Sequence, residues 1–110
     1  MTPFGIQSED RGAAVRLALT GDLDLATARE AEETIMEAET SRPRLLVLDL
    51  SDLEFMDSTG LRVILSAASR GDEEDRRVVI VKGPEVVQRV FEITRVAERL
   101  DMVENADEVL

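Results

Sequence analysis

Residues 45–68 read LLVLDLSDLEFMDSTGLRVILSAA, and this stretch decides the fold. It begins with a continuous apolar run over 45–48, which is typical of a central strand buried on both faces. A loop over 51–57 follows, and then apolar residues recur at the i, i+3, i+4 and i+7 spacing of an amphipathic helix. These helix positions are Leu61, Ile64, Leu65 and Ala68. The pattern predicts a helix over 58–70, with Gly71 as the residue just past its end.

The segments before this stretch predict a hairpin and a helix. Residues 4–9 and 14–20 are expected to be two strands, because the second alternates apolar and other side chains and Gly12 lies between them. A turn over 21–24 follows. Asp24 is a candidate N-cap for a helix that extends to about Thr40.

The segments after it continue the alternation of strands and helices. Residues 78–81 form a second buried strand, and Gly83-Pro84 fits the start of another helix. A short strand is expected over 100–103, and a single helical turn over 106–110. Strands that alternate with helices after a hairpin indicate a mixed α/β sheet with right-handed crossovers.

Composition limits the function classes. The chain has 110 residues, which fits one domain, and its 13 basic and 24 acidic residues give a net charge of −11. An acidic surface disfavours nucleic acid and anionic lipid, whose binding needs clustered Lys and Arg. It is compatible either with a partner that has a basic face or with no specific partner at all. No apolar run reaches the roughly 20 residues of a membrane span, so no membrane insertion is expected.

The chain also lacks the residues of common catalytic and metal sites. It has neither His nor Cys, which excludes Ser–His catalysis, His-ligated metals and thiol chemistry. No phosphate-binding loop or dinucleotide-binding glycine pattern occurs. We therefore expect no enzyme activity, no cofactor and no metal. The N-terminus lacks the features of a signal peptide, and a cytoplasmic location is expected.

The candidate functional residue is Ser58. If the helix begins there, its hydroxyl lies where unpaired backbone N–H groups and the positive end of the helix dipole favour negative charge. A small, exposed Ser at this place is suited to carry a phosphate. The alternative is structural, because Asp57, Ser58 and Thr59 are all residue types that cap helices.

Two further observations bear on this choice. Leu53, Phe55 and Met56 place large apolar residues where a polar loop is expected, and some of them are candidates for an exposed contact surface. Gly60 stands in the first helical turn, where glycine costs about 1 kcal/mol relative to Ala. Either close approach of a partner or tight internal packing would explain that glycine.

Three segments carry a family resemblance. VLDLSDLEFMDSTGLRVIL resembles the characteristic motif of the STAS domain, in the branch of bacterial anti-sigma factor antagonists. LALTGDLDLATAREAEE at 17–33 is similar to the second strand, turn and first helix of that family, and VKGPEVVQRVFEIT at 81–94 to its fourth strand and third helix. The resemblance covers nearly the whole chain. It implies one STAS domain over residues 1–110, with a mixed sheet of four to five strands and helices packed mainly on one face.

The resemblance also implies a function. Members of this branch bind an anti-sigma factor, a serine kinase with a GHKL-type ATP site, and thereby release a sigma factor. The kinase phosphorylates the Ser that follows the Asp of the D-S-S/T-G motif, phosphorylation ends binding, and a phosphatase restores it. By position, the phosphorylated residue is Ser58. The other residues expected to contact the partner are Asp22, Asp24, Met56, Asp57, Thr59, Gly60 and Arg62.

The chain departs from the family pattern in the C-terminal part. Arg95 stands where many relatives have Gly, and the last helix is short. A second function class also remains open, because STAS domains serve as constitutive adaptor or scaffold subunits of stress-signalling and transport complexes. Retention of Ser58 favours the phosphorylation-switched antagonist over the adaptor.

Overall fold

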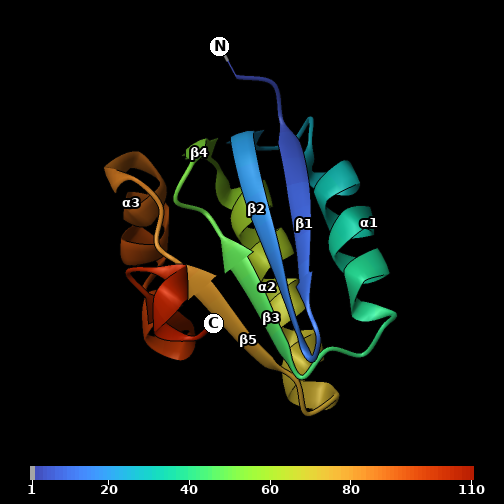
Figure 1. Cartoon of the computed structure of the whole chain (residues 1–110). Coiled ribbons are helices and arrows are strands. Elements are labelled where there is room, and N and C mark those ends of the chain that lie inside the picture. Colours follow the sequence, from blue (N-terminus) through green and yellow to red (C-terminus); the bar gives the residue numbers. More distant parts are fainter. Residues whose placement is uncertain (1) are drawn as a thin grey trace.

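The expected hairpin around Gly12 is formed by strands β1 (Gly5–Arg11) and β2 (Ala14–Leu23) (Figure 1). In this computed structural model, which describes residues 2–110, the hairpin is one edge of a six-stranded mixed sheet. The strand order is β1-β2-β3-β5-β6, and β4 pairs with the far end of β2. β3 (Leu45–Asp49), β5 (Arg77–Val81) and β6 (Asp101–Val103) pair in parallel, as crossovers through helices require.

The sheet has one strand more than the upper limit expected. β4 (Leu53–Met56) lies within the segment expected to be a loop, and it pairs in parallel with residues 21–23. β2 therefore extends to Leu23, into the turn expected over 21–24, with an irregularity in the register between Gly21 and Asp22. The sequence pattern missed this pairing because each partner segment is only three or four residues long.

The three helices pack on one face of the sheet, as expected. They are α1 (Ala28–Glu39), α2 (Ser58–Glu73) and α3 (Glu85–Thr94). Their inner faces join one core with the alternate side chains of β2, β3 and β5. The largest buried side chain of that core is Phe91 of α3, and aliphatic residues make up the rest of its buried members.

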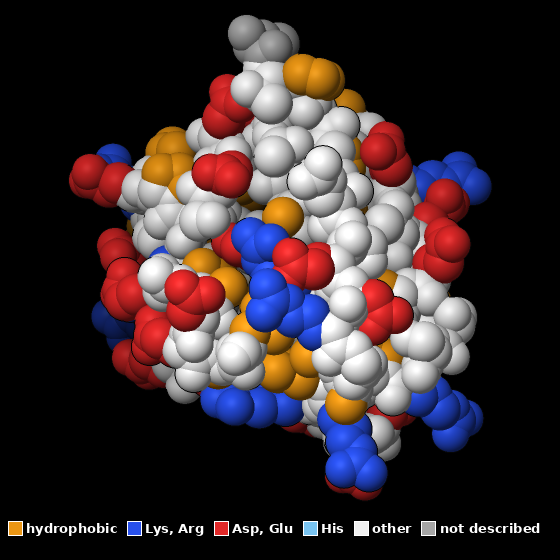
Figure 2. Space-filling model, in the orientation of Figure 1, with side chains coloured by type: hydrophobic (Ala, Val, Ile, Leu, Met, Phe, Trp, Pro, Cys, Tyr) orange, Lys and Arg blue, Asp and Glu red, His pale blue; other side chains and the backbone are white. Residues whose placement is uncertain are grey.

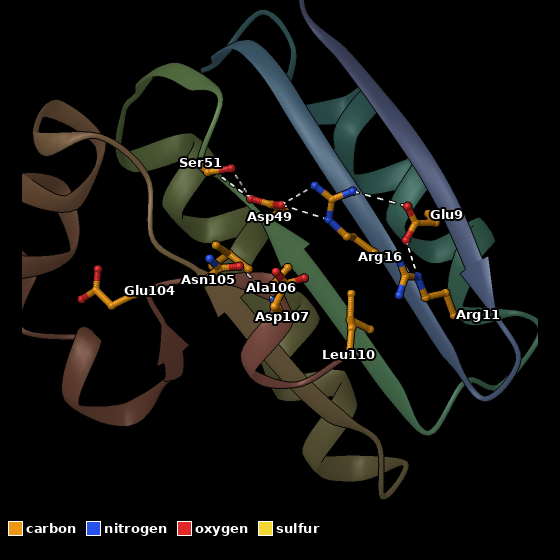
Figure 3. A pocket seen from close by; sticks show the side chains of 11 residues that line it. Glu9, Arg11, Arg16, Asp49, Ser51, Glu104, Asn105, Ala106, Asp107 and Leu110 are labelled. Atoms are coloured by element: carbon orange, nitrogen blue, oxygen red, sulfur yellow. Dashed lines mark hydrogen bonds and ion pairs between the residues drawn. The ribbon is translucent and has the colours of Figure 1, made fainter.

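The opposite face of the sheet is covered in part by the C-terminal segment. Two short 3₁₀ helices, over Ala97–Arg99 and Ala106–Glu108, flank β6, and the second lies in front of β3 and β5 (Figure 3). Val47 and Val79 on this face are fully buried. The central strand β3 is thus buried on both faces, which confirms the interpretation of its apolar run.

Two helix boundaries differ from the expected ones. The helix expected from Asp24 begins at Ala28, because residues 24–27 form a separate turn in which Thr27 N–H donates to the Asp24 carbonyl at 3.1 Å. The helix expected to end at Gly71 continues to Glu73. Gly71 is not a C′ residue. It lies inside α2, where a Cβ atom would come within 2.6 Å of the Val78 side chain, and the left-handed residue is Asp75, with φ of 55°.

Candidate functional site at the start of helix α2

Ser58 is the first residue of α2, and Asp57 is the N-cap. Asp57 Oδ1 accepts a hydrogen bond from the Gly60 backbone N–H at 2.9 Å, which fixes the first turn. Ser58 is exposed, and no other group within residues 2–110 forms a hydrogen bond with its hydroxyl. The cap is therefore supplied by Asp57, which leaves the Ser58 hydroxyl free of a structural role.

The backbone around Ser58 also has unused donors. In the described part of the chain, the N–H groups of Ser58 and Thr59 donate to no protein acceptor, and the first helical N–H with a backbone acceptor is that of Leu61, to Asp57 O at 3.0 Å. Free N–H groups at a helix start favour a negative group nearby. The site thus has a reactive hydroxyl beside two donors that an oxyanion would satisfy.

The turn that contains Asp22 and Asp24 lies directly beside this helix start. Asp22 is paired with Phe55 in the register of β2 and β4. Asp57 Oδ2 accepts from the Leu25 N–H at 3.3 Å, and Asp57 N–H donates to the Leu23 carbonyl at 3.3 Å. The structure therefore brings together two segments that lie about thirty residues apart in sequence.

Not all of the residues predicted from the sequence are accessible. Met56 is 1% exposed and belongs to the core, and Gly60 is buried. A Cβ atom at residue 60 would collide with the Leu23 carbonyl and lie 2.9 Å from Met56 Cγ. Internal packing, one of the two explanations left open by the sequence, accounts for Gly60. The side chain of Met56 is directed away from any partner surface.

Thr59 and Arg62 lie on the other side of Ser58, in a shallow groove between α1 and α2. The groove has a volume of about 200 Å³, and Ala28 and Glu32 line its α1 side. Arg62 is exposed and forms no ion pair in the part of the chain that the structure describes. It is one turn beyond Ser58 on the same helix, so its guanidinium faces any molecule that covers both residues.

The structure identifies two exposed apolar residues near this site: Phe55, one of the three apolar loop residues that the sequence offered as a contact surface, and Leu25, which sequence reasoning did not single out. Leu25 is 78% exposed and Phe55 is 42% exposed, while their apolar neighbours in sequence, Leu23 and Met56, are buried. Alternation along β4 separates Phe55 from Met56, and the sequence pattern gave no sign of that strand. Leu25 was detectable as an apolar residue that fits neither the preceding strand nor the helical face of α1.

The electrostatics around Ser58 are acidic. Asp57 precedes Ser58, and Asp22, Asp24 and Glu54 belong to the turn and strand beside this helix start. None of the four takes part in an ion pair among residues 2–110. No metal-binding group of acidic side chains occurs in the described residues. No helix there has the length and hydrophobicity needed to cross a bilayer. The arrangement offers a hydroxyl that can accept a phosphoryl group, flanked by carboxylates and two exposed apolar side chains.

A separate hollow of about 390 Å³ lies on the open face of the sheet, away from Ser58 (Figure 3). Asp49, which is 3% exposed, accepts from Arg16 Nη2 at 2.6 Å and from the Ser51 hydroxyl at 2.6 Å. Burial raises the pKa of the Asp49 carboxyl, but the hydrogen bonds from Ser51 and Arg16 together outweigh it, so that pKa lies below its ordinary value. Because the buried carboxylate is fully partnered, this network stabilises the fold.

Comparison with protein families gives one match. The family model described as "STAS domain" matches residues 6–109. Among curated proteins, the chain is similar to the anti-sigma-F factor antagonist RsfB of Mycobacterium tuberculosis, with 34% identity over 76 residues. That match covers 69% of this chain and 62% of RsfB. An anti-sigma-B factor antagonist of Staphylococcus aureus is 26% identical over 104 residues, which cover 94% of this chain and 96% of that protein.

Solved structures with the same fold carry related names. An anti-sigma factor antagonist from Mycobacterium paratuberculosis superposes with a TM-score of 0.83 at 24% identity, over 96% of this chain and 90% of that one. The anti-sigma factor antagonist SpoIIAA in its unphosphorylated form superposes with a TM-score of 0.72 at 20% identity, over 94% of this chain and 92% of that one. At these identities the likeness extends to the fold.

Proposed function

The chain belongs to the STAS domain family, and on that premise we propose that it is an anti-sigma factor antagonist switched by phosphorylation of Ser58. Its unphosphorylated form binds an anti-sigma factor that is also a GHKL-type serine kinase, and so releases a sigma factor. This kinase transfers the γ-phosphoryl group of ATP to Ser58 Oγ. A phosphatase removes the group, and all of these partners are cytoplasmic.

One structural observation carries the proposal. Within residues 2–110 the exposed Ser58 hydroxyl has no hydrogen-bond partner, because the side chain of Asp57 supplies the cap of α2. A Ser kept only to stabilise the helix start would use its side chain in the cap. The names of the relatives at 34% and 26% identity support the general function, and the motif resemblance supports Ser58 as the acceptor.

The physical basis of the switch is local charge. A phosphate adds about −1.5 to −2 charge at neutral pH, beside Asp57 and close to Asp22 and Asp24. The free N–H groups of Ser58 and Thr59 allow the fold to tolerate it. The structure of SpoIIAA in its phosphorylated form superposes on this chain with the same TM-score of 0.72 as the unphosphorylated form, which is compatible with a switch that leaves the fold intact.

The expected effect on binding is large. Burying an unpaired charge at an interface costs about 2–5 kcal/mol, which corresponds to ~30- to 4000-fold in affinity. We expect Ser58→Ala to bind the kinase but to escape phosphorylation, and Ser58→Asp to bind more weakly. The matched control is Ser69→Asp, which places the same charge at an exposed position further along α2.

The experiment is a pull-down from cell extract with each variant, followed by mass spectrometry and a binding titration with the captured kinase. The switch lies elsewhere if Ser58→Asp binds as tightly as the wild type while Ser58→Ala is still phosphorylated. Incubation of the wild type with extract and labelled ATP separates the antagonist from the constitutive adaptor. An adaptor gains no phosphate at Ser58.

We also propose the surface that the kinase contacts. It consists of the acidic residues Asp22, Asp24 and Asp57, the helix residues Ser58, Thr59 and Arg62, and the exposed apolar side chains of Leu25 and Phe55. Protein interfaces commonly have an apolar centre enclosed by a polar rim, and Leu25 and Phe55 would form such a centre here. Leu25→Ser should therefore weaken kinase binding about tenfold or more, while Ile93→Ser should not, because Ile93 is equally exposed (74%) but lies on α3.

A further inference from the structure

A second charged cavity lies at the end of the molecule opposite the start of α2. It is formed where the turn after α1 meets the turn after α2, just before the paired strands β3 and β5 begin (Figure 1). The cavity has a volume of about 400 Å³. Its lining, which we name the Arg76 pocket, consists of Arg42, Pro43, Arg44, Glu74, Asp75 and Arg76.

The backbone of the pocket is firmly held. Arg77 N–H donates to the Arg44 carbonyl at 2.9 Å, and Arg76 N–H donates to the Gly71 carbonyl at 2.8 Å. Arg42 and Asp75 have φ values of 53° and 55°, so each turn ends with a left-handed residue that redirects the chain into its strand. The arginines are therefore carried by two fixed turns on either side of one cavity.

Arg76 is the unusual residue of this pocket. It is 5% exposed, and its Nε and Nη2 atoms are buried without a hydrogen-bond acceptor among residues 2–110. The carboxylate paired with it is that of Glu74, 3.2 Å from Nη2, and the Glu74 side chain is itself half exposed. A buried guanidinium normally has its charge compensated and its donors satisfied. Arg76 has one partly exposed carboxylate partner, to which Nη1 donates at 3.4 Å, but Nε and Nη2 have no acceptor among the described residues. An additional anion would complete this incomplete set of contacts.

The neighbouring arginines add positive charge that is not balanced within the fold. Arg42 and Arg44 are exposed and form no ion pair in the described part of the chain. Three arginines and two acidic residues, Glu74 and Asp75, thus line the pocket. On a chain with a net charge of −11, an excess of positive charge around a cavity is notable. Figure 2 shows basic side chains at this lower end of the molecule.

The hollow on the open face of the sheet provides a contrast. There the buried carboxylate of Asp49 accepts hydrogen bonds from Arg16 and Ser51 (Figure 3). Arg16 in turn lies 3.7 Å from Glu9. All charged groups of that network have partners within it, whereas the Arg76 pocket has N–H donors without acceptors and one more positive than negative side chain.

We propose that the Arg76 pocket binds a small phosphoryl oxyanion, either inorganic phosphate or the phosphate group of a small ester. Guanidinium groups bind carboxylate and phosphate through paired N–H donors. A tetrahedral dianion presents oxygens in several directions and so meets three arginines from two turns, whereas a planar carboxylate meets fewer. The cavity volume lies within the range of small-ligand sites.

The test uses the full chain and follows backbone amide NMR signals during titration with inorganic phosphate, with chloride adjusted to keep ionic strength constant. We expect saturable shifts confined to residues 42–44 and 74–77, with no change at residue 58. A parallel titration with glycerol phosphate distinguishes the two sources. Tighter binding of the ester assigns the site to a phosphate monoester, and tighter binding of phosphate assigns it to the free ion.

Variants at the two exposed arginines make the test specific. Arg42→Gln and Arg44→Gln each remove one charge from the pocket without disturbing buried Arg76, and each should weaken phosphate binding about tenfold. Arg89→Gln removes an exposed charge from α3 and should leave binding unchanged. Two results would overturn the proposal. One is a set of linear shifts that do not saturate, and the other is equal phosphate binding by the wild type and the Arg42→Gln/Arg44→Gln double variant. Either result would mean that the cavity holds only solvent. This result is independent of any phosphorylation at Ser58.

Discussion

Leu23 occupies the space that a side chain at Gly60 would need. A Cβ atom there would collide with the Leu23 carbonyl oxygen and lie 2.8 Å from Leu23 Cγ. The same carbonyl accepts the Asp57 N–H at 3.3 Å. The end of β2 is thus pressed against the first turn of α2, and this contact sets the position of Ser58 relative to the acidic turn.

Gly60→Ala tests this packing through the sign of its effect. In an exposed helix the change would stabilise the protein by about 1 kcal/mol, because Ala is the better helix former. Here the added methyl group has no room, and we expect a loss of about 1–3 kcal/mol in the free energy of unfolding. Urea denaturation measures it. Ser69→Ala, at an exposed position of the same helix, serves as the control, and a stabilising Gly60→Ala would contradict the packing account.

The sequence predicted the strand and the helix on either side of the Ser58 loop better than the short strand within that loop. The apolar run of β3, the helical spacing of α2 and the start of that helix at Ser58 were all readable, because they depend on local periodicity. β4 was missed because it is short and its pairing with β2 depends on residues about thirty positions away. Without β4, the exposure of Phe55 and the burial of Met56 could not be separated.

The structural roles of the glycines were the hardest to predict from the sequence. A glycine near a helix end normally indicates a C′ residue, but Gly71 lies inside α2. Its role is steric, because Val78 and the Arg76 carbonyl fill the space where a side chain would be. Steric requirements of this kind arise from tertiary packing and have no local signal. The same limit left the explanation of Gly60 open until its neighbours were known.

The two helices α1 and α2 are linked by a partly buried ion pair. Arg70 Nε donates to Glu39 Oε1 at 2.7 Å and Nη2 to Oε2 at 3.1 Å, and the Glu39 carboxylate is buried. Burial alone lowers the pKa of the Arg70 guanidinium, but its contacts with Glu39 and Glu32 raise it above its ordinary value. Arg70→Ala leaves Glu39 buried without its partner, and we expect a loss of about 2–3 kcal/mol.

Urea denaturation of Arg70→Ala measures that loss. Arg29→Ala is the control, because its pair with Glu33 is exposed on α1 and should contribute less than about 0.5 kcal/mol. The double variant Arg70→Met/Glu39→Met should recover part of the loss, since the buried Glu39 carboxylate is then removed together with its partner. Equal effects of Arg70→Ala and Arg29→Ala would show that the buried pair adds nothing.

Asp49 makes stability depend on pH in the acid range. Its folded-state pKa lies below the ordinary value of 3.8, so its contribution is fully present above about pH 4 and is lost as pH falls through the folded-state pKa. Asp49→Asn should therefore destabilise the protein at pH 7, and the difference from the wild type should shrink as pH falls below 4. Thermal unfolding between pH 2.5 and 7 measures this. A difference that stays constant with pH would exclude Asp49 as the source.

Arg95 ends α3 in a conformation that favours glycine. Its φ of 59° and ψ of 20° are left-handed, which costs an ordinary residue about 1–2 kcal/mol. Gly avoids that cost but loses about 0.5–1 kcal/mol through the greater freedom of the unfolded chain. The balance predicts that Arg95→Gly stabilises the protein by about 0.5–1 kcal/mol, which thermal and urea unfolding would both detect. Arg89→Gly, inside the same helix, is the control and should instead destabilise the protein by about 1 kcal/mol. A loss of stability in both variants would contradict the prediction, because it would mean that contacts of the Arg95 side chain stabilise the fold by more than the backbone strain costs.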